Sequence, residues 1–307
     1  MTESSRAKQA LKCHYSMQRR HVHRRNHLLK NAQETLSILS SGGTYIDFNG
    51  GTFFVSNSTQ DAHDNTVLYP ADAPLPACGP APALSDTHFE FRKAHPAFAL
   101  SPDHEATRVG ILNAGSASAK HASTYFVNGG DDPEAALLRS STFDAVQRSP
   151  AALEWFRSHS SKTTAGAMSN ALLYTPNVKI IRSVEGRLVR PRTVDVLTAA
   201  APNVSAIAAH HTTDAPEVIA NVLRERCARA LSLFQLRGVR TVVLDNMGAD
   251  VDTAARVWCE LLGTDDAPFH NVFDRVVFAV AGHRHAAFRQ AFETYQYNAE
   301  LVSALSS

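Results

Sequence analysis

The chain has 307 residues, of which 44% are hydrophobic and 19% are charged, within the range of an ordinary globular protein. Its net charge is only +1, so no overall field draws it to nucleic acid or membrane, and no apolar run approaches the roughly 20 residues that span a bilayer. The four cysteines lie far apart and form no CxxC pair. We therefore expect reduced thiols in a cytoplasmic or nuclear protein that does not associate with membranes.

The first predicted element is a helix over residues 6–40, which the Ser41-Gly42-Gly43 segment ends. One interpretation of its charge is a nucleic-acid site or a targeting presequence. The other, which we favour, is a solvated helix face leading into an apolar continuation. Its basic residues, with no acidic residue among them, are Arg6, Lys8, Lys12, Arg19, Arg20, Arg24, Arg25 and Lys30.

A β-hairpin is predicted next, because β-forming residues at 44–48 and 52–55 flank an Asn49-Gly50 turn. Residues 56–86 are rich in Pro, Ala, Asp, Ser and Asn, and we expect mostly irregular structure there. A short strand is expected at residues 88–91.

Four short apolar runs characterise the rest of the chain, at residues 109–112, 194–197, 242–244 and 276–280. Nearly uninterrupted runs of this kind are typical of strands buried on both faces. Helical patterns at 132–148, 214–237, 251–262 and 284–304 separate or follow them. The alternation predicts an α/β fold with a largely parallel sheet flanked by helices. No GxGxxG follows the first run, so a Rossmann dinucleotide site is not supported.

Polar or small residues follow each apolar run, and in open α/β sheets ligands bind where parallel strands end. Asn113 follows the first run, whereas Asp245, Asn246 and Gly248 follow the third. These four residues are therefore candidate ligand contacts. The competing interpretation is that they simply form the turns between strands and helices.

The segment from Asn128 to Glu134 contains the clearest local signal. Gly129 and Gly130 allow positive φ and close approach of a ligand to the backbone. Asp132 suits an N-cap, and Pro133 suits the first helical position. A helix start of this kind can bind phosphate, but the acidic side chains crowding it favour a well-capped helix instead.

The order of segments resembles the microbial-type poly(ADP-ribose) glycohydrolase family over residues 20–295. This resemblance implies a macrodomain-like α/β core at residues 87–307, with residues 1–86 forming a helical and hairpin extension packed on it. The segments that carry it are Arg24–Leu36, Val109–Asn113, Phe126–Gly129, Leu137–Ser141, Leu173–Val178, Val194–Ala199, Ala201–Asn203, Val242–Leu244 and Val276–Phe278.

Departures from the family pattern fall where its chemistry occurs. The family's three-glycine run corresponds to Ser123-Thr124-Tyr125, and its Gln-Glu-Glu triplet corresponds to Pro133-Glu134-Ala135. The second glutamate, which the family uses for catalysis, is therefore Ala135. The family's second glycine-rich loop is reduced here to the segment after Leu244. Glycoside cleavage needs a carboxyl group that protonates the leaving oxygen. The resemblance thus implies a diverged protein with weak or absent glycohydrolase activity.

The resemblance implies ADP-ribose or an ADP-ribosylated macromolecule as the partner. The alternatives are a non-catalytic ADP-ribose or nucleotide-binding module, and an interaction protein that uses the basic helix, for example on nucleic acid. A hydrolase with relocated acids is a further alternative, with Asp131, Asp132 and Glu134 as the candidates. Ligand contacts are expected at Ser123, Thr124, Tyr125, Phe126, Asn128, Gly129 and Gly130, with a stacking role open to Tyr125 and Phe126.

We expect neither a metal nor a cofactor. His23 and His27 share a helix face, and His283 lies near His285, but no nearby carboxylate or cysteine completes a site.

Overall fold

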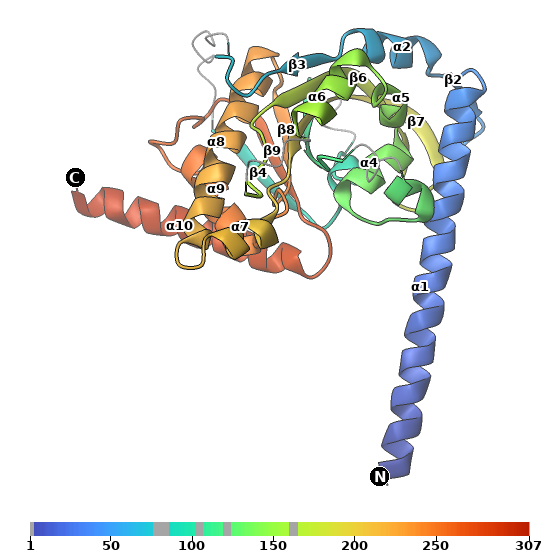
Figure 1. Cartoon of the computed structure of the whole chain (residues 1–307), viewed down its shortest axis with the longest axis horizontal. Coiled ribbons are helices and arrows are strands. Elements are labelled where there is room, and N and C mark those ends of the chain that lie inside the picture. The colour runs from blue at the N-terminus through green and yellow to red at the C-terminus, as the bar shows by residue number, and fades with distance from the viewer. Residues whose placement is uncertain (1–2, 76–85, 102–106, 119–123, 160–164, 307) are drawn as a thin grey trace.

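The computed structural model describes residues 3–75, 86–101, 107–118, 124–159 and 165–306. A seven-stranded sheet has the order β3-β6-β7-β5-β8-β9-β4 (Figure 1). Strands β7, β5, β8, β9 and β4 run parallel, whereas β6 is antiparallel to its neighbours β7 and β3. The strands are β3 (Val67–Tyr69), β4 (His88–Arg92), β5 (Val109–Gly115), β6 (Leu172–Arg182), β7 (Leu188–Ala200), β8 (Thr241–Leu244) and β9 (Arg275–Ala279).

Helices cover both faces of this sheet, which confirms the predicted α/β class. Among the described helices, none is both long and apolar enough to cross a membrane. The helices are α1 (Glu3–Ser40), α2 (Ser56–Asp64), α4 (Pro133–Ser140), α5 (Phe143–Val146), α6 (Pro150–Ser158), α7 (Val204–His210), α8 (Ala215–Leu236), α9 (Val251–Leu262) and α10 (Arg284–Ser306), with single 3-10 turns η1 (Pro96–Phe98) and η3 (Phe126–Asn128).

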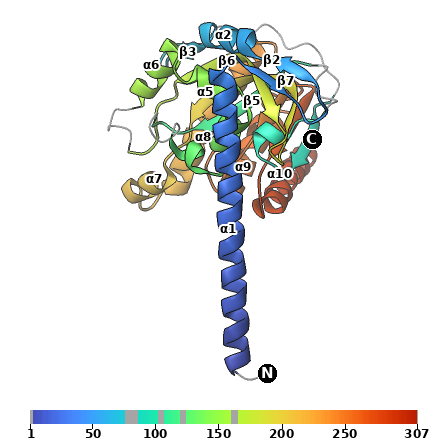
Figure 2. The same ribbon diagram turned by 90° about the vertical axis from the view of Figure 1, so that its right-hand side faces the viewer.

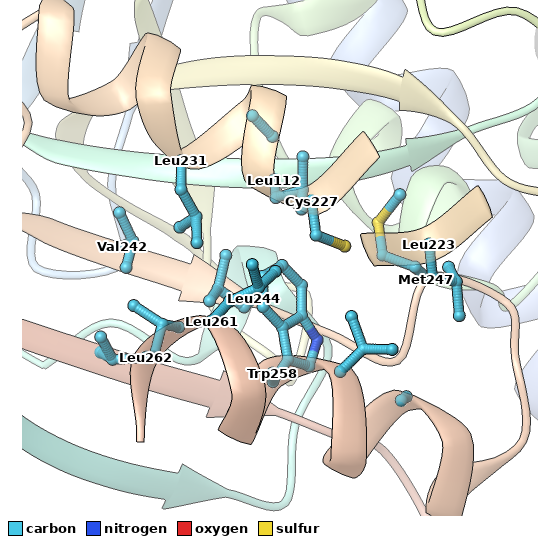
Figure 3. Close-up of a cluster of buried hydrophobic side chains, with 14 of the residues drawn as sticks. Leu112, Leu223, Cys227, Leu231, Val242, Leu244, Met247, Trp258, Leu261 and Leu262 are labelled. Atoms are coloured by element: carbon cyan, nitrogen blue, oxygen red, sulfur yellow. The ribbon is translucent and has the colours of Figure 1, made fainter. Parts of the chain in front are cut away.

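Alternation along the strands divides the core into two layers. Leu112, Val242 and Leu244 pack toward α8 and α9, together with Trp258 and Cys227 (Figure 3). Ile111 and Val243, the intervening residues, belong to the cluster on the opposite face with α4 and part of α1. Because both faces are covered, the strands are continuous apolar runs, as the sequence predicted.

The amino-terminal elements match their predictions. Helix α1 ends at Ser40, and Gly42 and Gly43 follow it with φ of 90° and 71°. Strands β1 (Thr44–Ile46) and β2 (Thr52–Phe54) pair as an antiparallel hairpin. Asp47 stabilises the turn, since its carboxylate accepts hydrogen bonds from the backbone N–H groups of Asn49 and Gly51.

Residues 56–86 contain more regular structure than predicted. Helix α2 forms there and packs on β6, and β3 pairs with β6 as an outer strand of the main sheet. Residues 76–85 lie outside the described residues. The polar composition of the segment concealed both elements, because α2 buries little more than Ala62.

The helix predicted over residues 132–148 is in fact two helices. Helix α4 ends at Ser140, and Ser141 takes an extended conformation in which it bridges to Ile180 of β6. The hydroxyl of Ser141 donates to the carbonyl of Leu137, and the backbone N–H of Thr142 donates to the carbonyl of Lys179. These tertiary contacts outweigh the local helical propensity.

Gly110 in β5 packs closely against the side chain of Phe234 in α8. A Cβ atom there would lie 2.4 Å from the buried ring of Phe234. We expect Gly110→Ala to lower the free energy of unfolding by roughly 1–3 kcal/mol, as overpacking does. In chemical denaturation, Gly110→Ala should cost less unfolding free energy in a Phe234→Leu background than in the wild type. Additive costs of the two changes would refute the clash.

Candidate functional site

The carboxyl ends of the parallel strands meet at one edge of the sheet. Asn113 of β5 lies in register with Thr198 of β7, and both side chains are buried. Asp245 and Asn246 follow β8 directly. The structure therefore brings three predicted residues, Asn113, Asp245 and Asn246, to a shared edge, where α/β proteins bind ligands.

Glu134 reaches this edge from the first turn of α4. Its Oε2 accepts a hydrogen bond of 2.9 Å from the backbone N–H of Ser116, and Oε1 lies 3.4 Å from Asn113 Nδ2. Gly115, the last residue of β5, packs closely against Thr198, since a Cβ at Gly115 would lie 2.5 Å from Thr198 Cγ2. Glu134 thus fixes the start of the loop that follows β5.

Burial dominates the electrostatics of this carboxyl group. Glu134 is 6% exposed, and burial raises its pKa to about 7, although the hydrogen bonds from Ser116 and Asn113 oppose the rise. Asp132 adds to the rise through its negative charge. Near neutral pH the carboxyl is therefore partly protonated, and its oxygens are already engaged by the protein.

Asp132 caps helix α4, and Ala135 packs in the core. Asp132 is the N-cap of α4, as predicted, and its Oδ1 accepts a hydrogen bond of 2.6 Å from the Ala135 backbone N–H. Ala135 is 2% exposed and packs in the core cluster with Phe126 and Leu137. Residue 135 therefore places a buried methyl group, and no carboxyl group, in the first turn of α4.

Asp131 belongs to an ion-pair cluster between α1 and the core. It lies 2.5 Å from Arg24 and 3.7 Å from both His95 and Arg139. Burial would raise the pKa of Asp131, but these basic neighbours together lower it below its ordinary value. Arg139 is itself buried and donates to the carbonyl of Gly130. Asp131 is thereby held in a structural cluster.

The loop before α4 is tied to α1. The amide of Asn128 donates to the carbonyl of Thr124, and Arg25 Nε donates to the carbonyl of Asn128 at 3.0 Å. Gly129 has φ of 79°, and a Cβ there would lie 2.7 Å from Arg25. Glycine is thus required at 129 both by backbone conformation and by contact with the helix.

The two aromatic residues of this loop differ in accessibility. Tyr125 is 40% exposed, and its ring covers Gly130, where an added Cβ would lie 2.3 Å away. Phe126 is 1% exposed and lies in the core, so the structure does not offer it as a stacking surface. Ser123 lies outside the described residues. Tyr125 is the aromatic residue of the pair that a ligand could reach.

The turn after β8 is anchored through its buried side chains. Asp245 Oδ1 accepts from the backbone N–H of Met247 at 2.7 Å, and the Asp245 carbonyl accepts from Trp258 Nε1. Burial raises the pKa of Asp245 to about 6, against the opposing effect of the Met247 hydrogen bond. Met247 has φ of 49° and inserts into the core near Trp258 (Figure 3).

The rest of this turn is equally self-contained. Asn246 Nδ2 donates to the carbonyl of Ala249, and the Ala249 N–H donates to the carbonyl of Asn246. Gly248 has φ of 76°, and a Cβ there would lie 3.3 Å from Ala201, just beyond β7. The Asn246 side-chain amide is therefore used by the turn itself, which leads directly into α9.

Comparisons with known proteins agree with this architecture. The sequence model of the microbial-type PARG catalytic domain matches residues 32–183. The structure of poly(ADP-ribose) glycohydrolase from Thermomonospora curvata superimposes with a TM-score of 0.74 at 29% identity, covering 86% of this chain and 99% of that one. A glutamate-to-alanine mutant of that enzyme aligns at 30% identity over the same shares, with a TM-score of 0.72. This chain belongs to the microbial-type poly(ADP-ribose) glycohydrolase family.

More distant structures share the fold. The Deinococcus radiodurans enzyme, solved in complex with ADP-ribose, aligns at 22% identity with a TM-score of 0.65, covering 77% of this chain and 97% of that one. No curated protein matches the chain. The chain thus combines the family fold with an alanine, Ala135, in the first turn of α4.

A hollow of about 690 Å³ beside Ser116 was not predicted from the sequence. Trp155 of α6 is buried in a cluster with the lining residues Phe156 and Met168, and its Nε1 donates to the carbonyl of Ala171. His159 places both ring nitrogens near carbonyl oxygens, those of Trp155 at 2.8 Å and Ser169 at 3.3 Å. The lining is mostly apolar and comes from segments far apart in the sequence: Ser116, Ala117, Ser118, Leu153, Phe156, Arg157, His159 and Met168.

Proposed function

We propose that this protein binds ADP-ribose, or ADP-ribosylated partners, at the carboxyl edge of its sheet and hydrolyses the glycosidic bond weakly or not at all. The observation that carries this proposal is the environment of Ala135 and Glu134. Ala135 contributes no proton donor and is buried in the core. Glu134 is buried with its oxygens engaged by Ser116 and Asn113.

Loss of the donor matters because of the reaction chemistry. Cleavage of a glycosidic bond passes through an oxocarbenium-like state, and a carboxyl group must protonate the departing oxygen. Adjacent residues on a helix point about 100° apart. Glu134 therefore does not present its carboxyl group where the side chain of residue 135 points.

The loop before α4 and the hollow beside Ser116 support the proposed binding of ADP-ribose. The Thermomonospora enzyme has also been solved with the inhibitor ADP-HPD, at 28% identity to this chain. In this chain the loop before α4 has two glycines, Gly129 and Gly130, and the exposed Tyr125 packs on Gly130. The apolar hollow next to Ser116 adds a surface suited to a planar ring.

A surviving hydrolase is the second candidate, and the raised pKa of Glu134 is the observation that favours it. A carboxyl group that titrates near neutral pH is suited to proton transfer. In that case Glu134→Gln or Asp132→Asn would abolish turnover while the protein stays folded. In a protein that only binds, the same substitutions would change ligand affinity, with no turnover to abolish.

Titration with ADP-ribose while the unfolding midpoint is followed tests the proposal. Ligand at 100 times its dissociation constant should stabilise the protein by roughly 2.7 kcal/mol. Tyr125→Ala should reduce the ligand-induced shift, whereas Tyr297→Ala, which removes a more exposed tyrosine on α10, should leave it unchanged. Absence of any shift at millimolar ADP-ribose would rule out both the binding and the hydrolase interpretations.

A further inference from the structure

Helix α1 extends far beyond the body of the protein. Figures 1 and 2 show its carboxyl-terminal half lying against the domain while its amino-terminal half projects away from it. Ala32 and Thr35 are buried against the core, whereas residues 22–27 are exposed. The buried residues of α1 that the structure describes therefore lie in its carboxyl-terminal half.

Over residues 6–30, the charged side chains of this helix are all basic. Residues 6–30 carry eight lysines and arginines and no acidic residue, although the whole chain has 30 basic and 29 acidic residues. At 1.5 Å per residue this basic stretch is about 37 Å long. Like charges repel along a helix, and a bound polyanion would relieve that repulsion.

The carboxyl-terminal part of the basic stretch lies against the candidate site. Arg25 donates to the carbonyl of Asn128 and packs on Gly129, and Arg24 pairs with Asp131. Two residues after Asp131, helix α4 starts and carries Glu134 to the loop after β5. The described contacts therefore connect the arm to the edge of the sheet through a single loop.

We propose that α1 is a docking arm for poly(ADP-ribose), in which the polymer chain beyond the terminal ADP-ribose runs along the basic helix. Each ADP-ribose unit contributes a diphosphate, so the polymer is a polyanion that matches an extended row of cations. This inference rests on the proposed function, because it places the terminal unit at the sheet edge. The arm makes long polymers bind more tightly than short ones, and the sheet edge binds the terminal ADP-ribose unit.

The test compares ligands of different length. In the full chain, Arg19 and Arg20 are both replaced by Gln, which keeps helix propensity and leaves the contacts of Arg24 and Arg25 intact. The control replaces Arg148 and Arg289, two exposed arginines outside α1, by Gln. Binding of monomeric ADP-ribose, long poly(ADP-ribose) and an RNA with the same number of phosphates is measured from low to physiological salt.

We expect the Arg19/Arg20 variant to lose roughly tenfold in polymer affinity near physiological salt. The slope of log affinity against log salt should fall by about 1.4, that is about 0.7 for each lost phosphate contact. Monomer affinity should change little, and the control variant should match the wild type. Polymer binding that ignores the substitution would overturn the docking arm.

Two other results have distinct meanings. RNA that binds as tightly as the polymer, with the same dependence on Arg19 and Arg20, would overturn the polymer assignment and make α1 a nucleic-acid arm. Absence of monomer binding in every variant, with polymer binding still dependent on the arm, would contradict the proposed function of the edge while supporting the arm as a polyanion site.

Discussion

Replacing Arg226 with Met is expected to lower the free energy of unfolding by roughly 3–5 kcal/mol, because it would leave several buried carbonyl groups without a donor. Arg226 is 1% exposed and comes from α8. It donates to the carbonyls of Ala200 and Ala167 at 2.7 Å each, and to Asn170 Oδ1. Burial lowers its pKa to about 10, so it stays charged at neutral pH.

The partners of Arg226 lie around the candidate site. Ala200 ends β7 at the carboxyl edge, and the neighbouring carbonyl of Met168, which also accepts from Arg226, belongs to a residue that lines the hollow beside Ser116. The variant should therefore also bind ADP-ribose less tightly at temperatures where it remains folded.

Chemical denaturation measures the loss of unfolding free energy in Arg226→Met, with a second substitution on the same helix as the control. Arg224→Met removes a partly exposed arginine that pairs with Glu260 at 2.8 Å. Such surface pairs contribute at most about 1 kcal/mol. Equal losses of unfolding free energy for the two arginine substitutions would show that the hydrogen bonds of Arg226 to the surrounding carbonyls do not stabilise the protein.

Glu134→Gln is expected to stabilise the protein at pH 8, by up to about 3 kcal/mol, and to lose this advantage as the pH falls toward 5. The folded-state pKa of Glu134 is about 7, above its ordinary value of 4.5. The folded protein therefore binds this proton more tightly than the unfolded chain does. Stability from Glu134 is complete below about pH 4.5 and is lost as the pH rises through 7. Glutamine cannot ionise, and its carbonyl can still accept from Ser116.

Free energies of unfolding at pH 5, 6, 7 and 8 test this expectation. Asp245 has a pKa raised to about 6, so its ionisation adds to the same trend in the wild type. The difference between variant and wild type isolates Glu134. Glu154→Gln, at an exposed carboxyl on α6, should change stability little at any of these pH values. A Glu134→Gln effect of constant size from pH 5 to 8 would contradict the buried titration.

Much of the fold was predictable because its strongest signals are local. Gly42 and Gly43 mark the end of α1, the Asn49-Gly50 turn marks the hairpin, and the apolar runs mark the central strands. Strand β6 was not predicted, since Pro176 and Asn177 interrupt its pattern and Asn177 has φ of 60°. Its pairing with β7 shifts register at that point. Tertiary pairing, which is invisible in a single segment, determines this strand.

The candidate site was predictable only in part, for the same reason. The cap at Asp132 and the gathering of Asn113 and Asp245 at one edge follow from local patterns and from strand direction. The burial of Phe126 and the pairing of Asp131 with Arg24 depend on where α1 docks. The hollow beside Ser116 joins residues more than 50 positions apart, from Ser116 to Met168. No spacing rule in the sequence brings these residues together.

Incubating the protein with long poly(ADP-ribose), and quantifying bound polymer and released ADP-ribose in the same samples, tests the proposed binding without efficient cleavage. We expect the polymer to be retained while release is weak or absent, because Ala135 supplies no proton to the leaving oxygen. Sustained release over many turnovers, abolished by Glu134→Gln in a protein that remains folded, would contradict this expectation.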